Sequence, residues 1–167
     1  MSEDDCTAPK HYDAHDALLY ELVGFCCLSE TLNAALMLAT LEKTTVRRIK
    51  DVVHSLLSDE VKHGQLGWGM LQWSLECGRG GFISDALVGL LQSIGFTNLY
   101  AGPSEESWPE ELTAHGELSL SFRREIFVSA MNSIIFAGFD HAGISTESTR
   151  CWLTAYEPRF GESSVRP

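Results

Sequence analysis

The chain has 167 residues, of which 44% are hydrophobic, and this is enough for one domain with a sizeable core. Twelve basic and 23 acidic residues give a net charge of -11, which argues against a nucleic-acid partner and against an anionic membrane surface. The five cysteines, an odd number, suit a reducing and therefore cytoplasmic compartment better than a disulfide framework.

Residues 1–12 start with an acidic stretch and lack an apolar run, so they predict a disordered N-terminus rather than a signal peptide. Apolar residues at helical spacing then predict a long helix over about 13–43. The run 22–41 is nearly long enough to cross a membrane, but Glu30, Asn33 and several hydroxyl residues interrupt it, and no basic clusters flank it. We therefore expect a buried bundle helix and no membrane span.

A second long helix is expected over about 46–76, with Thr44 or Thr45 as its N-cap and glycines 78, 80 and 81 near its end. Three shorter helices follow in the pattern, over 86–94, about 119–138 and 147–156. Their expected N-terminal caps are hydroxyl or acidic residues, namely Ser84-Asp85 for the first, Ser119 or Ser121 for the second, and Ser145 or Thr146 for the third.

No strand-like alternation is present, so the sequence predicts an all-α fold in which two long antiparallel helices are joined by two or three shorter ones. The predicted domain covers residues 13–157, and 158–167 form a flexible tail. Residues 97–117 are polar and contain two prolines, which indicates either a mobile flap or a segment with a short helical turn.

Glu60 and His63 are the main candidate site residues. They are three residues apart and share one helix face, and both residue types bind metals. Glu30 lies in a similar setting on the first long helix. Apolar residues accompany all three, so they are expected to face a core rather than water: Ile49, Val53, Leu56, Gly67 and Leu71 on one helix, and Val23, Cys26, Cys27, Ala34, Met37 and Leu41 on the other.

A buried charge needs a partner, and one shared cation would satisfy all three side chains. Glu30 lies 14 residues before Thr44, and Glu60 lies 15 residues after Thr45. At a rise of ~1.5 Å per residue, the two carboxylates stand ~21 Å and ~22 Å from the turn, so they are level in an antiparallel hairpin. The alternative is a core histidine, with His63 hydrogen-bonded to Asp59 or Glu30.

Paired helices with a Glu on one and Glu-x-x-His on the next resemble half of a ferritin-like di-iron carboxylate bundle, in which two such halves enclose two metals. The stretches Cys27-Leu-Ser-Glu30-Thr31, Asp59-Glu-Val-Lys-His63 and Leu66-Gly-Trp68 carry the resemblance, over roughly residues 15–77. It implies that Glu30, Glu60 and His63 are metal ligands and catalytic residues. It further implies that Asp59 accepts a hydrogen bond from a ligand imidazole of the opposite half-site; a plain surface Asp is the alternative.

The chain contains no second Glu…Glu-x-x-His set, because Glu125 and the pair Asp140-His141 have neither the spacing nor the apolar surroundings. Two outcomes follow. Two chains could pair about a two-fold axis, as encapsulated ferritins do with a similar half-bundle, so that symmetry completes the site. Otherwise the later helices cover the face and leave a mononuclear or vacant remnant. The homodimer is the preferred prediction.

A completed site would hold two Fe ions, or Mn, because each metal is offered carboxylate oxygens and one imidazole. The resemblance implies O₂ or peroxide as co-reactant, and oxidation of Fe(II) to Fe(III) as the least demanding reaction. Oxidation of an organic substrate, with the 97–117 segment as a lid, stays open. The rival hypothesis is a metal-free helical scaffold or interaction protein, in which the acid–imidazole cluster is an internal hydrogen-bond network.

Overall fold

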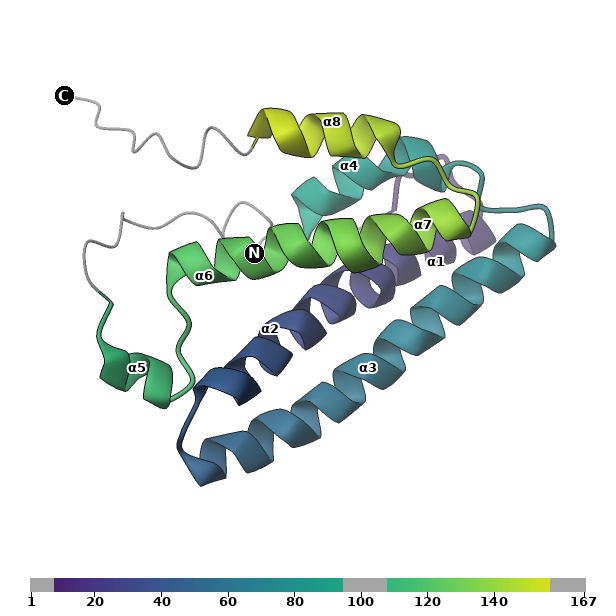
Figure 1. Cartoon of the computed structure of the whole chain (residues 1–167). Coiled ribbons are helices and arrows are strands. Elements are labelled where there is room, and N and C mark those ends of the chain that lie inside the picture. Colours follow the sequence, from purple (N-terminus) through teal and green to yellow (C-terminus); the bar gives the residue numbers. More distant parts are fainter. Residues whose placement is uncertain (1–7, 95–107, 157–167) are drawn as a thin grey trace.

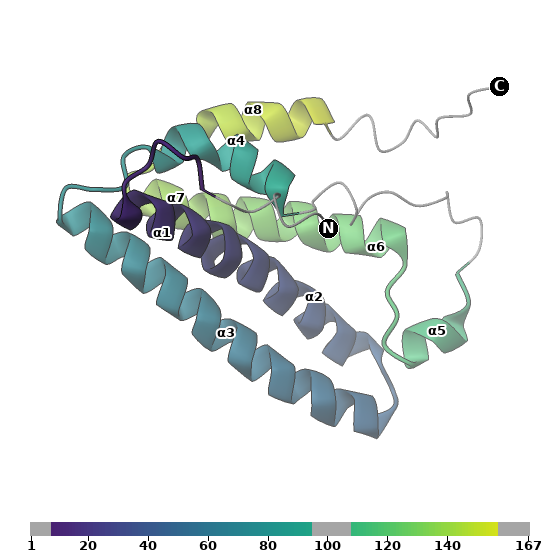
Figure 2. The same cartoon turned by 180° about the vertical axis from the view of Figure 1, so that it is seen from behind.

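The computed structural model describes residues 8–94 and 108–156. This part of the chain is helical and contains no strand, which confirms the all-α prediction. Three long helical rods lie side by side, and two shorter helices cover one side of them (Figures 1 and 2). The predictions for residues 1–7, 97–107 and 158–167 concern segments outside the described residues.

The first rod consists of α1 (Ala14–Leu22), the π-helical segment η1 (Val23–Ser29) and α2 (Glu30–Lys43). It starts at Asp13, whose carboxylate accepts hydrogen bonds of 2.9 Å from the backbone N–H groups of His15 and Asp16. By length and composition this rod could cross a membrane, with a mean hydropathy of 1.6. The core helix of a globular protein passes the same criterion, so the prediction of no membrane span stays a prediction.

The second rod is α3 (Arg47–Glu76), which runs antiparallel to the first. The prediction of a threonine N-cap is wrong: the cap residue is Val46, and it makes no side-chain hydrogen bond. Thr44 instead donates its hydroxyl to the carbonyl oxygen of Ala114 at 2.6 Å, and the Thr45 N–H donates to the same oxygen at 3.0 Å. These bonds hold the short helix α5 (Glu110–Ala114) against the turn between the two rods.

Glycines allow the two rods to approach closely. A Cβ added to Gly67 would lie 2.4 Å from the Cβ of Cys26, and one added to Gly64 would lie 3.7 Å from the Cys26 carbonyl oxygen and from the Thr31 hydroxyl. The two rods therefore approach closely at these two glycines. Gly69 has nothing within 4 Å of such a Cβ, and the structure offers no reason for a glycine there.

The third rod comprises α6 (Leu120–Ala130), the π-helical segment η2 (Met131–Ile135) and α7 (Phe136–His141). Its N-cap is Ser119, whose hydroxyl accepts from the Phe122 N–H at 3.2 Å. The remaining helices, α4 (Ile83–Ser93) and α8 (Glu147–Tyr156), pack on each other, and α4 also packs on α1 and η1 of the first rod (Figures 1 and 2). The predicted cap of α4 is wrong, because Ser84 donates its hydroxyl to the carbonyl oxygen of Ser145.

The core lies between the first and third rods and α4, and it consists mainly of leucine, isoleucine and phenylalanine side chains. Trp68 connects α3 to it: its ring packs on Phe139 at 4.9 Å between centroids, and its indole N–H donates to the Thr31 hydroxyl at 3.3 Å. Trp73 of the same helix is 52% exposed. Each fully buried large apolar side chain stabilises the folded chain by about 1.5–3 kcal/mol.

Tyr12, which the sequence places in the disordered N-terminus, lies against the bundle. The ring of Tyr12 packs on Phe82 at 4.7 Å and on Tyr20 at 5.9 Å between centroids. Aromatic pairs at such distances contribute about 0.5–1.5 kcal/mol beyond area burial, so this contact anchors the chain entry to α1.

Candidate metal centre

The side chains of Glu30, Glu60 and His63 converge, with one ligand atom from each lying within 4.8 Å of the others. Glu30 is the first residue of α2, and the other two lie in the middle of α3. Helix α2 is regular from Glu30 to its end at Lys43, so the rise per residue that levels the two carboxylates applies along the whole distance. The predicted group of three side chains thus forms within one chain.

The π-helical segment η1 ends directly before Glu30. Such segments are uncommon in proteins and occur frequently at functional sites. Here η1 holds Cys27 and Leu28 in the core while Cys26 fits against Gly67 of α3. Because η1 packs tightly on α3 one turn from Glu60 and His63, it fixes the position at which Glu30 starts α2.

The burial of the three side chains differs. One carboxylate oxygen of Glu60, Oε2, is buried, and no hydrogen-bond donor among the described residues reaches it. The Glu30 side chain is 23% exposed, whereas His63 is 58% exposed. The expectation that all three face a core is therefore wrong for His63.

The reason lies in the position of α3. This helix is the edge of the described bundle and contacts only the first rod along most of its length (Figures 1 and 2). Its face toward η1 and α2 is buried, and the neighbouring face, which carries His63 and Leu56, has no described helix over it. An apolar stripe in the sequence does not distinguish a face covered by the same chain from one left open.

The alternative of an internal hydrogen-bond network gains no support from the distances. His63 Nδ1 lies 3.9 Å from Glu30 Oε1, which is within ion-pair range but too long for a hydrogen bond. With an exposed ring and no hydrogen bond to either candidate acceptor, His63 does not have the environment of a core histidine. The side chains are close enough to share an ion and are not bonded to each other.

Asp59 lies on the exposed side of α3, where it accepts a hydrogen bond of 2.9 Å from the Lys62 ammonium group. This bond is the main cause that lowers the pKa of Asp59 below its ordinary value, and the charges of Lys62 and His63 act in the same direction. Within one chain Asp59 therefore forms a surface ion pair. Its predicted hydrogen bond to an imidazole of an opposite half-site concerns a second chain.

The adjacent thiols are not suited to metal binding. Cys27 is buried and Cys26 is half-buried, and burial raises the pKa of both thiols. Metals bind the thiolate, which burial disfavours. Both cysteines act as small apolar residues where the first rod meets α3, as the sequence indicated.

A second acid–imidazole group, formed by Asp13, His15 and Asp16, also has ligand atoms within 4.8 Å of one another. Sequence reasoning missed it, although the spacing of the three residues around a helix start could have indicated it. Arg79 lies 3.1 Å from Asp13 Oδ2 and 3.5 Å from Asp16 Oδ1, and the Asp13 carboxylate caps α1. Both carboxylates thus already have partners, and the group stabilises a helix start.

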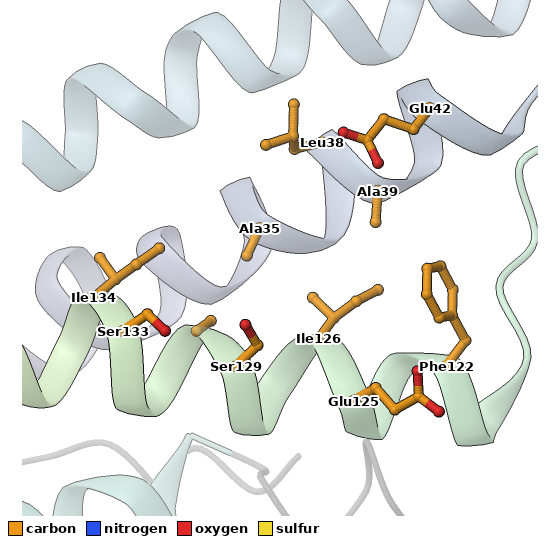
Figure 3. A pocket seen from close by; sticks show the side chains of 11 residues that line it. Ala35, Leu38, Ala39, Glu42, Phe122, Glu125, Ile126, Ser129, Ser133 and Ile134 are labelled. Carbon is orange, nitrogen blue, oxygen red and sulfur yellow. The ribbon is translucent and has the colours of Figure 1, made fainter.

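The other acids of the third rod lie apart from the group of Glu30, Glu60 and His63. Glu125 lines an open apolar groove of about 370 Å³ between α2 and α6, together with Glu42 at one end (Figure 3). Asp140 accepts hydrogen bonds from the Thr146 hydroxyl at 2.7 Å and from Arg150 at 2.8 Å. The described part of the chain therefore contributes three donors to this candidate metal centre.

Comparison with protein-family models, curated proteins and solved structures gives no match for this chain. The case for a metal centre consequently rests on the residues and their geometry.

Proposed function

We propose that this chain is a ferritin-like metal-binding protein in which two chains, related by a two-fold axis, complete a di-iron or mixed Mn/Fe site from Glu30, Glu60 and His63 of each. The observation that carries the proposal is the buried and unpartnered Oε2 of Glu60 within this group. A buried carboxylate oxygen without a donor costs free energy, and a bound cation would offset that cost.

The donor set fits such an ion. Protein nitrogen and oxygen ligands lie about 2 Å from a bound divalent transition metal, so donors on one ion are about 3–4 Å apart. His63 Nδ1 and Glu30 Oε1 are 3.9 Å apart, and the whole group lies within 4.8 Å. Small rotations of the Glu side chains close the remaining difference. Two carboxylates and one imidazole suit Fe(II) or Mn(II) better than softer metals, which prefer thiolates.

Three donors from one chain leave part of a metal's coordination open. The His63 ring is exposed, on a face of α3 that no described helix covers, so a second chain can approach it. About a two-fold axis the same three residues of each chain meet, so six protein ligands become available for two ions. The twofold repetition of one Glu and one Glu-x-x-His also matches the ligand set of the ferritin-like bundles that the sequence resembles.

Iron held in this way supplies a one-electron Fe(II)/Fe(III) couple that reacts with O₂ or peroxide. With Fe(II) as the substrate, two ions each lose one electron, and O₂ gains both electrons and two protons to become H₂O₂. The chain's carboxylates balance the positive charge, and the flexible Glu side chains accommodate its increase. Ferroxidase activity is therefore the proposed reaction.

The test compares Glu60→Ala with the wild type after anaerobic loading with Fe(II) and desalting. We expect about one Fe per chain in the wild type and nearly none in Glu60→Ala, together with loss of O₂-dependent Fe(II) oxidation. Glu76→Ala, a change at an exposed carboxylate on the same helix, should bind iron like the wild type. Equal and negligible metal in all three proteins would instead favour the metal-free scaffold.

A further inference from the structure

Helix α3 carries two parallel stripes of residues, each spaced alternately by three and four. The inner stripe faces the first rod and includes Glu60, Gly64, Gly67 and Leu71. The outer stripe is shifted by one residue, so it lies on the neighbouring face, about 100° around the helix from the inner stripe. Its members are Ile49, Val52, Leu56, Asp59, His63, Leu66, Met70 and Trp73.

Most of the outer stripe is exposed although it is largely apolar. Val52, Leu56, Leu66 and Trp73 are between 47% and 59% exposed, and Ile49 and Met70 are half-buried. It extends over 24 residue steps, or about 36 Å of helix. Alternating spacing of three and four is the seam of a coiled coil, in which a second helix packs along the stripe. An exposed apolar seam of this length marks an interaction surface.

We propose that the outer stripe binds the outer stripe of a second copy of this chain, antiparallel, with the two-fold axis crossing at the level of Val61. Each residue then faces the one that lies equally far on the other side of Val61. Leu56 packs on the partner's Leu66, Val52 on the partner's Met70, and Ile49 on the partner's Trp73. Every residue of the stripe therefore has a partner residue from the stripe of the second chain.

This register is selected by the polar residues in the middle. With the axis at Val61, Asp59 faces the partner's His63, so the two polar members of the stripe meet each other in two equivalent layers. Moving the axis along α3 by half a heptad in either direction places both Asp59 and His63 opposite apolar residues and leaves two apolar residues beyond the end of the overlap. Burying an unpaired charge costs several kcal/mol, so these registers are disfavoured.

The occupant that suits this stripe is a second copy of this chain, because Asp59 and His63 then face each other across the two-fold axis. A lipid surface is the less suitable occupant, because the centre of the stripe carries Asp59 and His63, which are costly in hydrocarbon. The stripe follows from exposure and spacing alone; its use in joining two half-sites rests on the proposed function.

The test is disulfide trapping. In a background with Cys6, Cys77 and Cys151 changed to Ser, Leu56→Cys and Leu66→Cys are made singly and together, oxidised, and separated by non-reducing gel electrophoresis. Both positions are exposed, so the changes spare the chain's core. We expect the double variant to form a covalent dimer of twice 18.5 kDa, and neither single variant to do so, because identical positions are ~15 Å apart along the helix.

Cross-linking by either single variant would indicate a parallel pairing, and no cross-linking by the double variant would exclude this seam; either result overturns the proposal. Trapping is done with EDTA and again with Mn(II), and metal content is measured on the same samples. A covalent dimer that takes up no metal contradicts the proposed function and leaves the seam intact. Metal uptake at the expected ratio without a covalent dimer contradicts the seam alone.

Discussion

The carboxylate of Glu60 is the side chain on which the account depends most, because the described chain buries one of its oxygens and offers it no donor. Proteins avoid this arrangement, since a buried oxygen without a hydrogen bond costs about 1–3 kcal/mol. Under the proposed function, a bound cation offsets this cost. The cost also means that the metal-free protein is less stable than its packing allows.

The first prediction concerns the stability of Glu60→Ala, measured by thermal unfolding with and without Mn(II). Without metal, the variant should be as stable as the wild type or more stable, because the unpartnered carboxylate is gone and Ala favours a helix. With Mn(II) at 100 times its dissociation constant, the wild type should gain about 2.7 kcal/mol and the variant nothing. A variant that is less stable without metal and still responds to Mn(II) would contradict this assignment.

The second prediction concerns pH and Asp140, which is remote from the metal group. Hydrogen bonds from Thr146 and then from Arg150 lower the pKa of Asp140 below its ordinary value. A carboxylate with a lowered pKa in the folded state stabilises the protein above its ordinary pKa of about 3.9, and this contribution is lost as the pH falls through the folded value. Asp140→Asn should therefore be less stable than the wild type at pH 7.

The difference between Asp140→Asn and the wild type should shrink as the pH falls below about 4 in urea unfolding curves. Asp51→Asn is the control, because Asp51 is exposed on α3 and has no ion pair among the described residues. A deficit of Asp140→Asn that stays the same at pH 3 would show that the side chain contributes by packing and not by its charge.

At the scale of elements, the contact between η1 and α3 positions the candidate site. Gly67→Ala would place a methyl carbon 2.4 Å from the Cys26 Cβ and 3.1 Å from backbone atoms of residues 26 and 27, which cannot move without shifting η1. The third prediction is a loss of about 1–3 kcal/mol in unfolding free energy and weaker Mn(II) binding, because Glu30 directly follows this segment.

Gly69→Ala is the matched control for Gly67→Ala, two residues further along the same helix. A Cβ there meets nothing within 4 Å, so the change should stabilise α3 by up to about 1 kcal/mol and leave Mn(II) binding unchanged. If both substitutions changed the unfolding free energy in the same direction, helix propensity and not the close approach of the rods would control stability in this region.

The elements also show what a sequence can indicate. The level position of Glu30 and Glu60 was predictable, because α2 and α3 are regular between these residues and the turn. The π-helical segment η1 was not predictable, because the periodicity of an apolar run does not distinguish a π-helix from an α-helix. The predictions of N-caps at Thr44 and Ser84 were wrong, because these hydroxyls donate to carbonyl oxygens that are distant in sequence. The acceptors are Ala114 and Ser145, respectively.

At the scale of the whole molecule, the apolar residues of α3 predicted burial that one chain does not provide. Leu56 and His63 belong to a stripe that the described helices leave uncovered, whereas Gly67 and Leu71 are buried. Hydrophobic spacing alone does not distinguish a face that the same chain covers from one that the chain leaves open. The positions of the third rod and α4 show that the described helices leave the face with Leu56 and His63 uncovered.

The fourth prediction tests the pairing by sedimentation. Leu66→Glu puts a charge into the outer stripe and should convert the dimer to a monomer with at least a tenfold weaker association. Val61→Glu adds the same charge at an exposed apolar residue on the opposite side of α3, and it should leave the dimer intact. Dissociation of both variants, or of neither, would place the dimer contact elsewhere.

Native mass spectrometry of the wild-type protein after Fe(II) loading reports the number of chains and the number of metal ions in the same particle, so it tests whether two chains share the metal centre. We expect two chains carrying two iron ions, while Leu66→Glu gives single chains that retain little or no iron. Iron-free dimers, or single chains that bind iron as tightly as the dimer does, would contradict a metal centre shared across a two-fold axis.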